Sequence, residues 1–150
     1  MDPTRAGSDL LYFAYGANLS RAHMALWCPD AVPLAPATWP DHRLVFRTWV
    51  DVVPSPGDAV QGALYEVGAR DLAALDEFEE CPTLYRRVRV RVVSQESPFE
   101  AMTYRMNPGR TLALPEPDYL GLILQGYEDW QLDRSLLAVM ERETHNAFEN

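Results

Sequence analysis

The chain has 150 residues, of which 47% are hydrophobic and 11% aromatic, enough for one compact core but too little for two ordinary domains. The formal net charge is −9, and such an acidic chain repels phosphate backbones, which excludes nucleic acid as a partner. The two cysteines, Cys28 and Cys81, lie far apart, which favours a reducing cytoplasmic location over a disulfide scaffold.

The N-terminus and the hydropathy pattern predict a simple organisation. Residues 1–9 are short, polar and mixed in charge, and they lack the apolar run of about 7–15 residues that a signal peptide needs. We therefore expect a flexible leader. Residues 10–150 are expected to form a single domain, because no repeat or linker divides them. No segment approaches the roughly 18–20 apolar residues of a membrane span, so we expect no membrane contact.

The segment 11–20, Leu-Tyr-Phe-Ala-Tyr-Gly-Ala-Asn-Leu-Ser, predicts a buried strand, a tight turn and a helix that continues to Trp27. Gly16 permits a close approach of the backbone, and Asn18 or Ser20 can cap the helix. Backbone N–H groups at such a turn favour a bound carboxylate or oxyanion. An ordinary strand-to-helix turn would use the same residues, so a binding role requires a partner elsewhere in the chain.

The later elements follow from the same kinds of pattern. We expect extended chain with turns over 29–40, strands over 43–50, 59–67, 84–93 and 100–106, a loop over 51–58, and helices over 69–79, 118–130 and 132–140. Gly62, inside an expected strand, indicates a bulge or a close backbone approach. The elements do not alternate as in a parallel α/β protein, so the sequence predicts an α+β fold around a curved, mostly antiparallel sheet.

A candidate partner for the turn lies at the end of the expected helix 69–79. Advancing about 100° per residue from Leu72 places Glu79 on the same apolar stripe as Leu75, whereas Glu77 faces away. Burial would raise the pKa of Glu79 and suit it to proton transfer near neutral pH. The alternative is a carboxylate in water at a frayed helix end.

Blocks of sequence in the same order resemble the γ-glutamylcyclotransferase family. They are Tyr12-Phe-Ala-Tyr-Gly-Ala-Asn-Leu19, Ser55-Pro-Gly-Asp-Ala-Val-Gln-Gly62, Leu75-Asp-Glu-Phe-Glu79 followed by Tyr85, and the late segments Met102-Thr-Tyr-Arg-Met106 and Pro115-Glu-Pro-Asp-Tyr-Leu120. The resemblance covers nearly the whole chain. It implies a small mixed, mostly antiparallel β-barrel with flanking helices, in which the Tyr-Gly-x-Asn turn and one glutamate face the same cavity.

The resemblance also implies roles for individual residues. It makes Glu79 the catalytic acid and base, and it assigns the substrate loop to Tyr15, Gly16, Ala17, Asn18 and Leu19. Three further tyrosines match positions that line the pocket: Tyr85, Tyr104 and Tyr119. Each tyrosine taken alone also fits a core or strand position.

Two positions depart from the family pattern. Glu80 stands where glycine is usual after the catalytic glutamate, and a left-handed backbone there would cost roughly 1 kcal/mol. Ala17 stands where serine is frequent, which removes a hydroxyl but keeps the backbone N–H. Glu80 therefore affects the expected geometry of the turn after the glutamate, whereas the Glu79 carboxylate itself is retained.

The implied reaction needs no metal and no cofactor. In a γ-glutamyl amide the α-amine attacks its own γ-carbonyl, which closes the 5-oxoproline lactam and expels the amine. The expected partner is therefore a small-molecule γ-glutamyl substrate, and the protein is expected to be a monomer or homodimer. Two alternatives remain open: removal of a γ-glutamyl protecting group or isopeptide from a specialised intermediate, and a non-catalytic domain that binds a small ligand.

Other candidate chemistry has little support in the sequence. The histidines lack metal-ligand spacing and fit surface or satisfied positions: His23, His42 and His145. Nothing around Cys28 indicates a thiol of lowered pKa, so we expect no thiol nucleophile.

Overall fold

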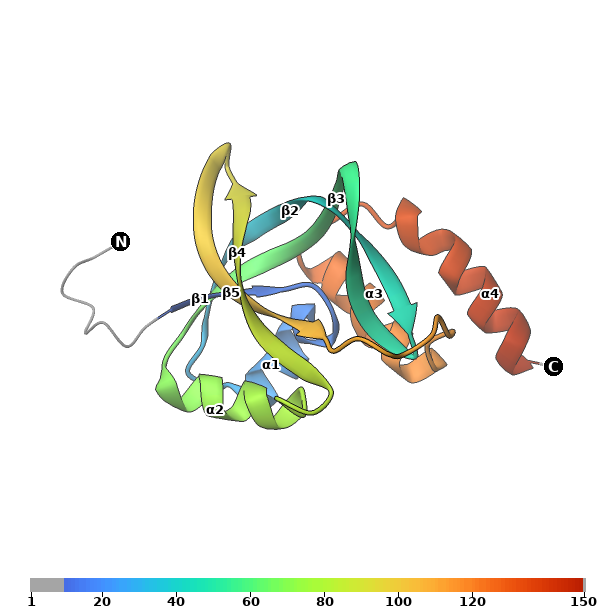
Figure 1. The fold of residues 1–150 in the computed structure, drawn as a ribbon, viewed down its shortest axis with the longest axis horizontal. Helices are drawn as coiled ribbons and strands as arrows, with labels where there is room; N and C mark the ends of the chain where they lie inside the picture. The colour runs from blue at the N-terminus through green and yellow to red at the C-terminus, as the bar shows by residue number, and fades with distance from the viewer. Residues whose placement is uncertain (1–9, 150) are drawn as a thin grey trace.

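In the computed structural model, which describes residues 10–149, five strands close into a barrel in the order β1-β3-β2-β4-β5 (Figure 1). The strands are β1 (Leu10–Ala14), β2 (Val32–Arg47), β3 (Trp49–Val67), β4 (Tyr85–Ser94) and β5 (Ser97–Met106). Neighbouring strands pair antiparallel except β1 and β5, which run parallel and pair Tyr12 with Met102. The predicted α+β fold with a mixed, mostly antiparallel barrel is confirmed. The expected leader, residues 1–9, lies outside the described residues.

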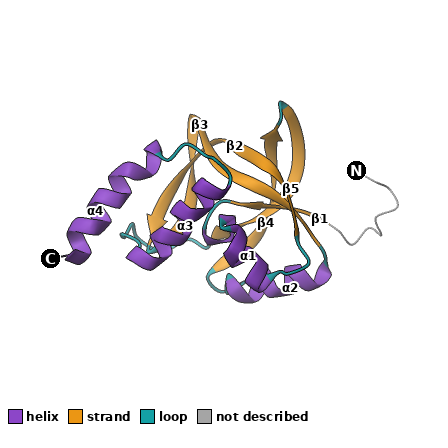
Figure 2. Cartoon of the chain, turned by 180° about the vertical axis from the view of Figure 1, so that it is seen from behind, coloured by secondary structure: helices purple, strands orange, loops and turns teal. Residues whose placement is uncertain are grey.

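The helices gather on one side of the barrel. They are α1 (Arg21–Trp27), α2 (Ala69–Phe78), α3 (Pro117–Asp129) and α4 (Ala138–Glu149), with 3-10 turns at Ala17–Leu19 and Ser135–Leu137. Helix α1 contacts both α2 and α3, and α3 also contacts the turn after β1. Figure 2 shows these three helices along the strands, with α4 apart near the C-terminus. In the described part of the chain, no helix combines the length and apolar character required to cross a membrane.

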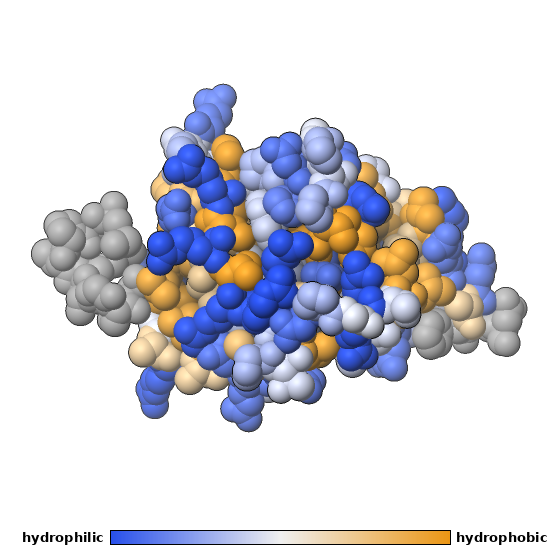
Figure 3. All heavy atoms as spheres, in the orientation of Figure 1, coloured by the Kyte–Doolittle hydropathy of each residue, from blue (hydrophilic) through white to orange (hydrophobic). Residues whose placement is uncertain are grey.

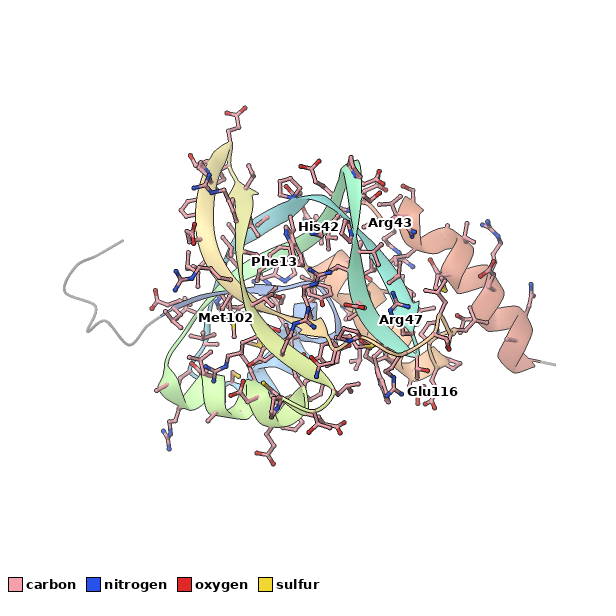
Figure 4. All side chains as sticks on the ribbon, viewed as in Figure 1. Phe13, His42, Arg43, Arg47, Met102 and Glu116 are labelled. Atoms are coloured by element: carbon pink, nitrogen blue, oxygen red, sulfur yellow. The ribbon has the colours of Figure 1, made fainter. Side chains whose placement is uncertain are left out.

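The barrel interior holds aromatic side chains from β1 and β2. Phe13, which is labelled in Figure 4, is fully buried. Its ring meets the Trp39 ring edge-on with the centroids 6.4 Å apart. A Cβ at Gly62 would overlap both the Ala14 carbonyl oxygen and the Phe13 ring, which confirms the predicted close backbone approach. On the face seen in Figure 1, hydrophilic residues cover much of the surface and hydrophobic residues form separate patches (Figure 3).

The long hairpin of β2 and β3 corrects the expectations for residues 43–58. The two strands pair continuously except at two register shifts, and the chain turns at residues 47–49. The expected strand 43–50 therefore spans the hairpin turn, and the loop expected over 51–58 is wrong. The extended chain with turns expected over 29–40 is confirmed by a turn at residues 29–30 and by β2 from Val32 onward. Gly57, with φ 87°, donates its N–H to the Asp41 carboxylate at 3.0 Å, which marks a bulge beside one register shift.

Prolines are tolerated in this hairpin because much of it has a strand partner on one side only. β1 pairs with β3 only from Ala63 onward, so the first part of β3 has β2 as its strand partner. On the other side, β2 pairs with β4 through Thr38 and Val93. At edge positions a missing N–H does not break a ladder, so proline and strand are compatible.

The last predicted helix, 132–140, is also corrected. The structure places a 3-10 turn over Ser135–Leu137 and then α4 over Ala138–Glu149. The Asp133 carboxylate accepts the Ser135 N–H at 2.9 Å. A carboxylate in this position favours a helical turn that begins after it, which explains the later start.

Candidate functional site

A cavity of about 940 Å³ lies between the turn after β1, the C-terminal end of α2 and one face of α3. Its walls include eight of the nine site residues predicted from the sequence: Tyr15, Gly16, Ala17, Asn18, Glu79, Tyr85, Tyr104 and Tyr119. These residues come from segments far apart in the sequence, and the fold brings them to one space.

Leu19 is the predicted site residue that the cavity wall does not include within the described residues. It is fully buried beneath the turn, and its carbonyl accepts the Trp130 indole N–H at 2.9 Å. A Cβ at Gly126 of α3 would overlap Leu19, so the helix and the turn are packed closely. Leu19 thus fixes the turn against α3.

The turn after β1 is built from short-range hydrogen bonds. Ser20 caps α1, because its Oγ accepts the His23 N–H at 3.3 Å, which selects Ser20 over Asn18 as the cap. Within the 3-10 turn, the Leu19 N–H donates to the Gly16 carbonyl at 3.0 Å. The first N–H groups of such a turn have no acceptor inside it.

The side chains of Asn18 and Glu79 meet inside the cavity. Asn18 is 2% exposed, and its Nδ2 lies 3.4 Å from Glu79 Oε1 and 3.2 Å from the Tyr12 hydroxyl oxygen. Among the described residues, Asn18 Oδ1 has no hydrogen-bond partner. A buried acceptor without a donor costs about 1–3 kcal/mol. The cavity therefore offers an unpartnered acceptor beside a carboxylate.

Glu79 follows the last residue of α2 and lines the cavity in a half-buried position. Burial raises the pKa of its carboxyl to about 8. Glu77 is exposed, so the predicted orientation of both residues is confirmed, and a carboxylate in water at a frayed helix end is excluded. Glu80 has φ 52°, which is the left-handed backbone for which glycine is favoured.

Two cavity tyrosines hold the backbone of Val50 at the start of β3. Tyr119 accepts the Val50 N–H at 3.1 Å, and Tyr85 donates its hydroxyl to the Val50 carbonyl at 2.5 Å. Gly16 packs against the same residue, since a Cβ there would lie 2.7 Å from Val50 Cγ2. The turn after β1 and the hydroxyls of both tyrosines therefore all contact Val50.

The other two tyrosines are bonded to the barrel and to α2. Tyr15 donates to the Tyr104 carbonyl at 2.6 Å, and Tyr104 donates to the Asp76 carboxylate at 2.6 Å. Asp76 also accepts the Arg87 Nε–H at 2.9 Å. Partial burial raises the pKa of Asp76, but the bonds from Arg87 and Tyr104 outweigh it, so the net pKa is below the usual value.

Tyr12 and His23 are among the residues of the wall that sequence reasoning missed. Tyr12 is 3% exposed, and its hydroxyl accepts from Asn18, yet a tyrosine in a buried strand gives no sign of which face it lines. His23, expected at a surface or satisfied position, instead lines the cavity, and its Nε2 is buried without a partner among residues 10–149. Burial lowers the pKa of His23, which favours a neutral imidazole. The sequence signal that could have indicated His23 is its position three residues after Ser20, the residue that caps α1.

Two other kinds of chemistry find no support at this site. Within residues 10–149, no group of three histidine, cysteine, aspartate or glutamate side chains is arranged to hold a metal ion. Cys28 is buried, and burial followed by the nearby Asp71 charge raises the pKa of its thiol to about 11. A thiol of raised pKa is a poor nucleophile at neutral pH, as the sequence predicted.

Comparison with known proteins identifies the family. Residues 12–132 match the family described as gamma-glutamyl cyclotransferase, AIG2-like. Gamma-glutamylcyclotransferase of Bos taurus is 30% identical over 137 residues, which cover 82% of this chain and 72% of that protein. Gamma-glutamylaminecyclotransferase of Bos taurus is 43% identical over 54 residues, which cover 35% of this chain and 32% of that one.

The fold gives the same answer. A solved gamma-glutamyl cyclotransferase superposes with a TM-score of 0.79 and 28% identity, over 89% of this chain and 86% of that chain. The chain therefore belongs to the gamma-glutamyl cyclotransferase, AIG2-like family, which confirms the resemblance found in its sequence.

Proposed function

We propose that this protein is a γ-glutamyl cyclotransferase, which cleaves a γ-glutamyl amide by intramolecular attack of the α-amine and releases 5-oxoproline and a free amine. The observation that carries the proposal is the inward carboxylate of Glu79, 3.4 Å from Asn18 Nδ2, while Asn18 Oδ1 has no hydrogen-bond partner among residues 10–149. The names of the relatives support this reaction class.

The glutamyl half of the substrate has complementary groups on the turn and at the helix end. Its α-ammonium suits Asn18 Oδ1 and the Glu79 carboxylate, which accept hydrogen bonds. Its negatively charged α-carboxylate, or the oxyanion that develops on the γ-carbonyl, suits the N–H groups of Ala17 and Asn18 at the start of the 3-10 turn. Binding in this way brings the α-nitrogen toward the γ-carbonyl.

Glu79 moves the protons in this proposal. It accepts a proton from the α-ammonium, and the freed nitrogen attacks the γ-carbon to form the lactam C–N bond. As the original amide C–N bond breaks, Glu79 returns a proton to the leaving nitrogen. The α-nitrogen loses two protons in all, and the released amine gains two as it becomes an ammonium ion.

The raised pKa of Glu79 suits both steps. With a pKa of about 8, the carboxyl is a better base than an ordinary glutamate and still a competent acid near neutral pH. The substrate ammonium favours the charged carboxylate, so binding itself prepares the base. Intramolecular attack contributes up to roughly 7–11 kcal/mol and one acid or base about 10²–10⁴-fold, so no enzyme nucleophile is needed.

The test is incubation of the purified protein with γ-glutamyl dipeptides, γ-glutamyl amines and glutathione, followed by mass spectrometry of the products. We expect 5-oxoproline from at least one member of the panel. Free glutamate as the sole product would mean hydrolysis and would overturn the proposal. Ligand binding without any product would instead favour the non-catalytic alternative.

The physiological setting forms part of the same proposal. We propose a small-molecule γ-glutamyl substrate, a cytoplasmic location and a monomeric or homodimeric single domain. Light scattering on the purified protein measures the oligomeric state, and a mass of more than two chains would contradict it.

A further inference from the structure

The residue directly before Glu79 packs against two rings of α1. The centroid of the Phe78 ring lies 4.9 Å from that of His23 and 4.8 Å from that of Trp27, with interplanar angles of 66° and 59°. Inclined aromatic pairs with centroids about 4.5–7 Å apart attract each other. His23 and Trp27 are four residues apart, so they lie on one face of α1. Phe78 therefore joins the end of α2 to that face of α1, and Figures 1 and 2 both show the two helices side by side.

The backbone at Glu79 lies at a helix end, where helices fray readily. Phe78 is the last residue of α2, and the Glu79 N–H donates to the Leu75 carbonyl at 2.8 Å. The next residue, Glu80, has φ 52°, a left-handed backbone that is less favourable for glutamate than for glycine. The carboxylate is thus carried by a segment that needs support from side-chain packing.

The side-chain contact of Glu79 within the cavity does not supply that support alone. Its Oε1 lies 3.4 Å from Asn18 Nδ2, which is long for a hydrogen bond. Proton transfer requires the carboxylate to come within hydrogen-bond reach of the substrate nitrogen. A misplacement of about 1 Å can cost about 100-fold in rate. The rate should therefore depend on what fixes the backbone of Glu79.

From these contacts we infer that Trp27 is a positioning residue for the reaction: it acts through Phe78 to fix the end of α2 and so holds the Glu79 carboxylate in place. The inference rests on the proposed cyclotransferase function and adds to it a residue outside the cavity. Among the described residues, the lining includes His23 and Phe78 but not Trp27. An effect of Trp27 on turnover is therefore exerted through the residues that it contacts.

The kinetic test compares Trp27→Ala with two matched variants. We expect kcat for 5-oxoproline release at 25 °C to fall at least about fivefold in Trp27→Ala, with KM changed less than about twofold, because the turn that binds the glutamyl half is not displaced. Trp27→Phe keeps a ring against Phe78 and should retain at least about half of the wild-type kcat. Leu26→Ala removes an apolar side chain from the same helix at a position that is 82% exposed, and its kcat should equal that of the wild type. Circular dichroism checks that each variant is folded at 25 °C.

Amide hydrogen exchange, followed by NMR without substrate, tests the structural step by itself. In Trp27→Ala the amide of Glu79 should exchange at least about fivefold faster than in the wild type, because the end of α2 opens more often. The amide of Leu72, which donates to the Gly68 carbonyl at 3.0 Å near the start of α2, should be unchanged. Both amides should keep their wild-type rates in Leu26→Ala. Trp27→Leu keeps apolar bulk without a ring, and the same results are expected from it if Trp27→Ala does not fold.

The outcomes separate this inference from the function on which it rests. If the wild type yields no 5-oxoproline from any member of the panel, the proposed function fails, and the exchange rates still decide whether Trp27 fixes the end of α2. Unchanged exchange at Glu79, or faster exchange with unchanged kcat, would overturn the inference. Equally faster exchange at Leu72 and Glu79 would also overturn it, because the whole helix would then be loosened. An equal loss of kcat in Leu26→Ala would do the same, since the loss would not depend on the ring of Trp27.

Discussion

Two parts of the cavity wall use their polar side chains in opposite ways. On the barrel side, the tyrosine hydroxyls have protein partners, since Tyr85 donates to the Val50 carbonyl and Tyr104 to the Asp76 carboxylate. At the turn and the helix end, Asn18 Oδ1 has no hydrogen-bond partner in the part of the chain that the structure describes, and burial raises the pKa of Glu79 to about 8. The barrel side thus fixes the shape of the cavity, and the turn and helix end hold the groups available to a substrate.

Two carboxylates about one helical turn apart show the same contrast: Asp76 in α2 and Glu79, which directly follows α2. Asp76 is bonded to Arg87 and Tyr104, which hold its net pKa below the usual value. Glu79 has no such cationic partner in the described part of the chain, and burial raises its pKa. A paired carboxylate stabilises structure, whereas an unpaired buried one is suited to proton transfer.

The largest expected effect comes from Glu79→Gln. The amide keeps the size and hydrogen bonding of the carboxyl but cannot exchange a proton in the reaction, so kcat should fall by about 100-fold or more. The measurement is the rate of 5-oxoproline release from the best substrate of the panel. Glu77→Gln, two residues away on the exposed face, should keep its activity. Retained activity in Glu79→Gln together with lost activity in Glu77→Gln would contradict the role of Glu79 as the acid and base.

The next effect concerns Gly16, which connects the two parts of the wall. A Cβ at this position would lie 2.7 Å from Val50 Cγ2, so Gly16→Ala must shift the turn or the residue that holds Tyr85 and Tyr119. We expect a folded protein at 25 °C with kcat/KM reduced at least about tenfold, or roughly 1.4 kcal/mol. Circular dichroism and steady-state kinetics test both statements.

A double variant separates two causes of that loss. In Gly16→Ala/Val50→Ala the clash with Val50 is removed, while the methyl group next to the turn remains. Recovery of activity would mean that displacement of Val50 caused the loss, and persistent loss would mean that substrate approaches the backbone of the turn. Ala17→Ser, which restores the frequent family residue, should be tolerated. An unfolded Gly16→Ala protein would contradict the prediction.

A third prediction uses the pH dependence of stability. The pKa of Glu79 is raised on folding, so its contribution is fully present below about pH 4.5 and is lost as the pH rises through about 8. Glu79→Gln lacks this dependence. The free energy of unfolding of the variant, relative to that of the wild type, should therefore rise by at least about 1 kcal/mol between pH 5 and pH 8, since each unit of pKa shift is worth about 1.4 kcal/mol. Denaturant unfolding at both pH values measures the difference, and a constant difference would mean that Glu79 is not desolvated.

Much of the fold followed from local patterns in the sequence. The buried strand before Gly16 and the helix that ends beside Glu79 were predicted because apolar spacing and turn residues agreed. The hairpin of β2 and β3 was not, because proline and glycine normally mark loops, and only the pairing of strands shows which edge is free of a partner. A short stretch of sequence does not contain this information about the pairing of distant strands.

The candidate site was likewise predicted from the sequence only in part. Helical spacing indicated Glu79, and the resemblance to the family supplied the positions of the tyrosines. Neither indicated that Leu19 is packed under the turn, or that Tyr12 and His23 line the cavity. Whether a residue faces a core or a cavity depends on what packs opposite it, which in this fold comes from α2 and α3.

The smallest effect on activity is expected from Tyr104→Phe, and it tests the comparison most directly. The hydroxyl of Tyr104 is bonded to Asp76, which keeps its bonds to Arg87, so its removal should cost about 1 kcal/mol of stability. Because the ring stays in the wall and the hydroxyl is already engaged, kcat/KM should change at most about threefold. Unfolding curves and kinetics on the same preparation measure both. A tenfold loss of activity with unchanged stability would mean that this hydroxyl acts on the substrate. The barrel side of the wall would then take part in the reaction and not only fix the shape of the cavity.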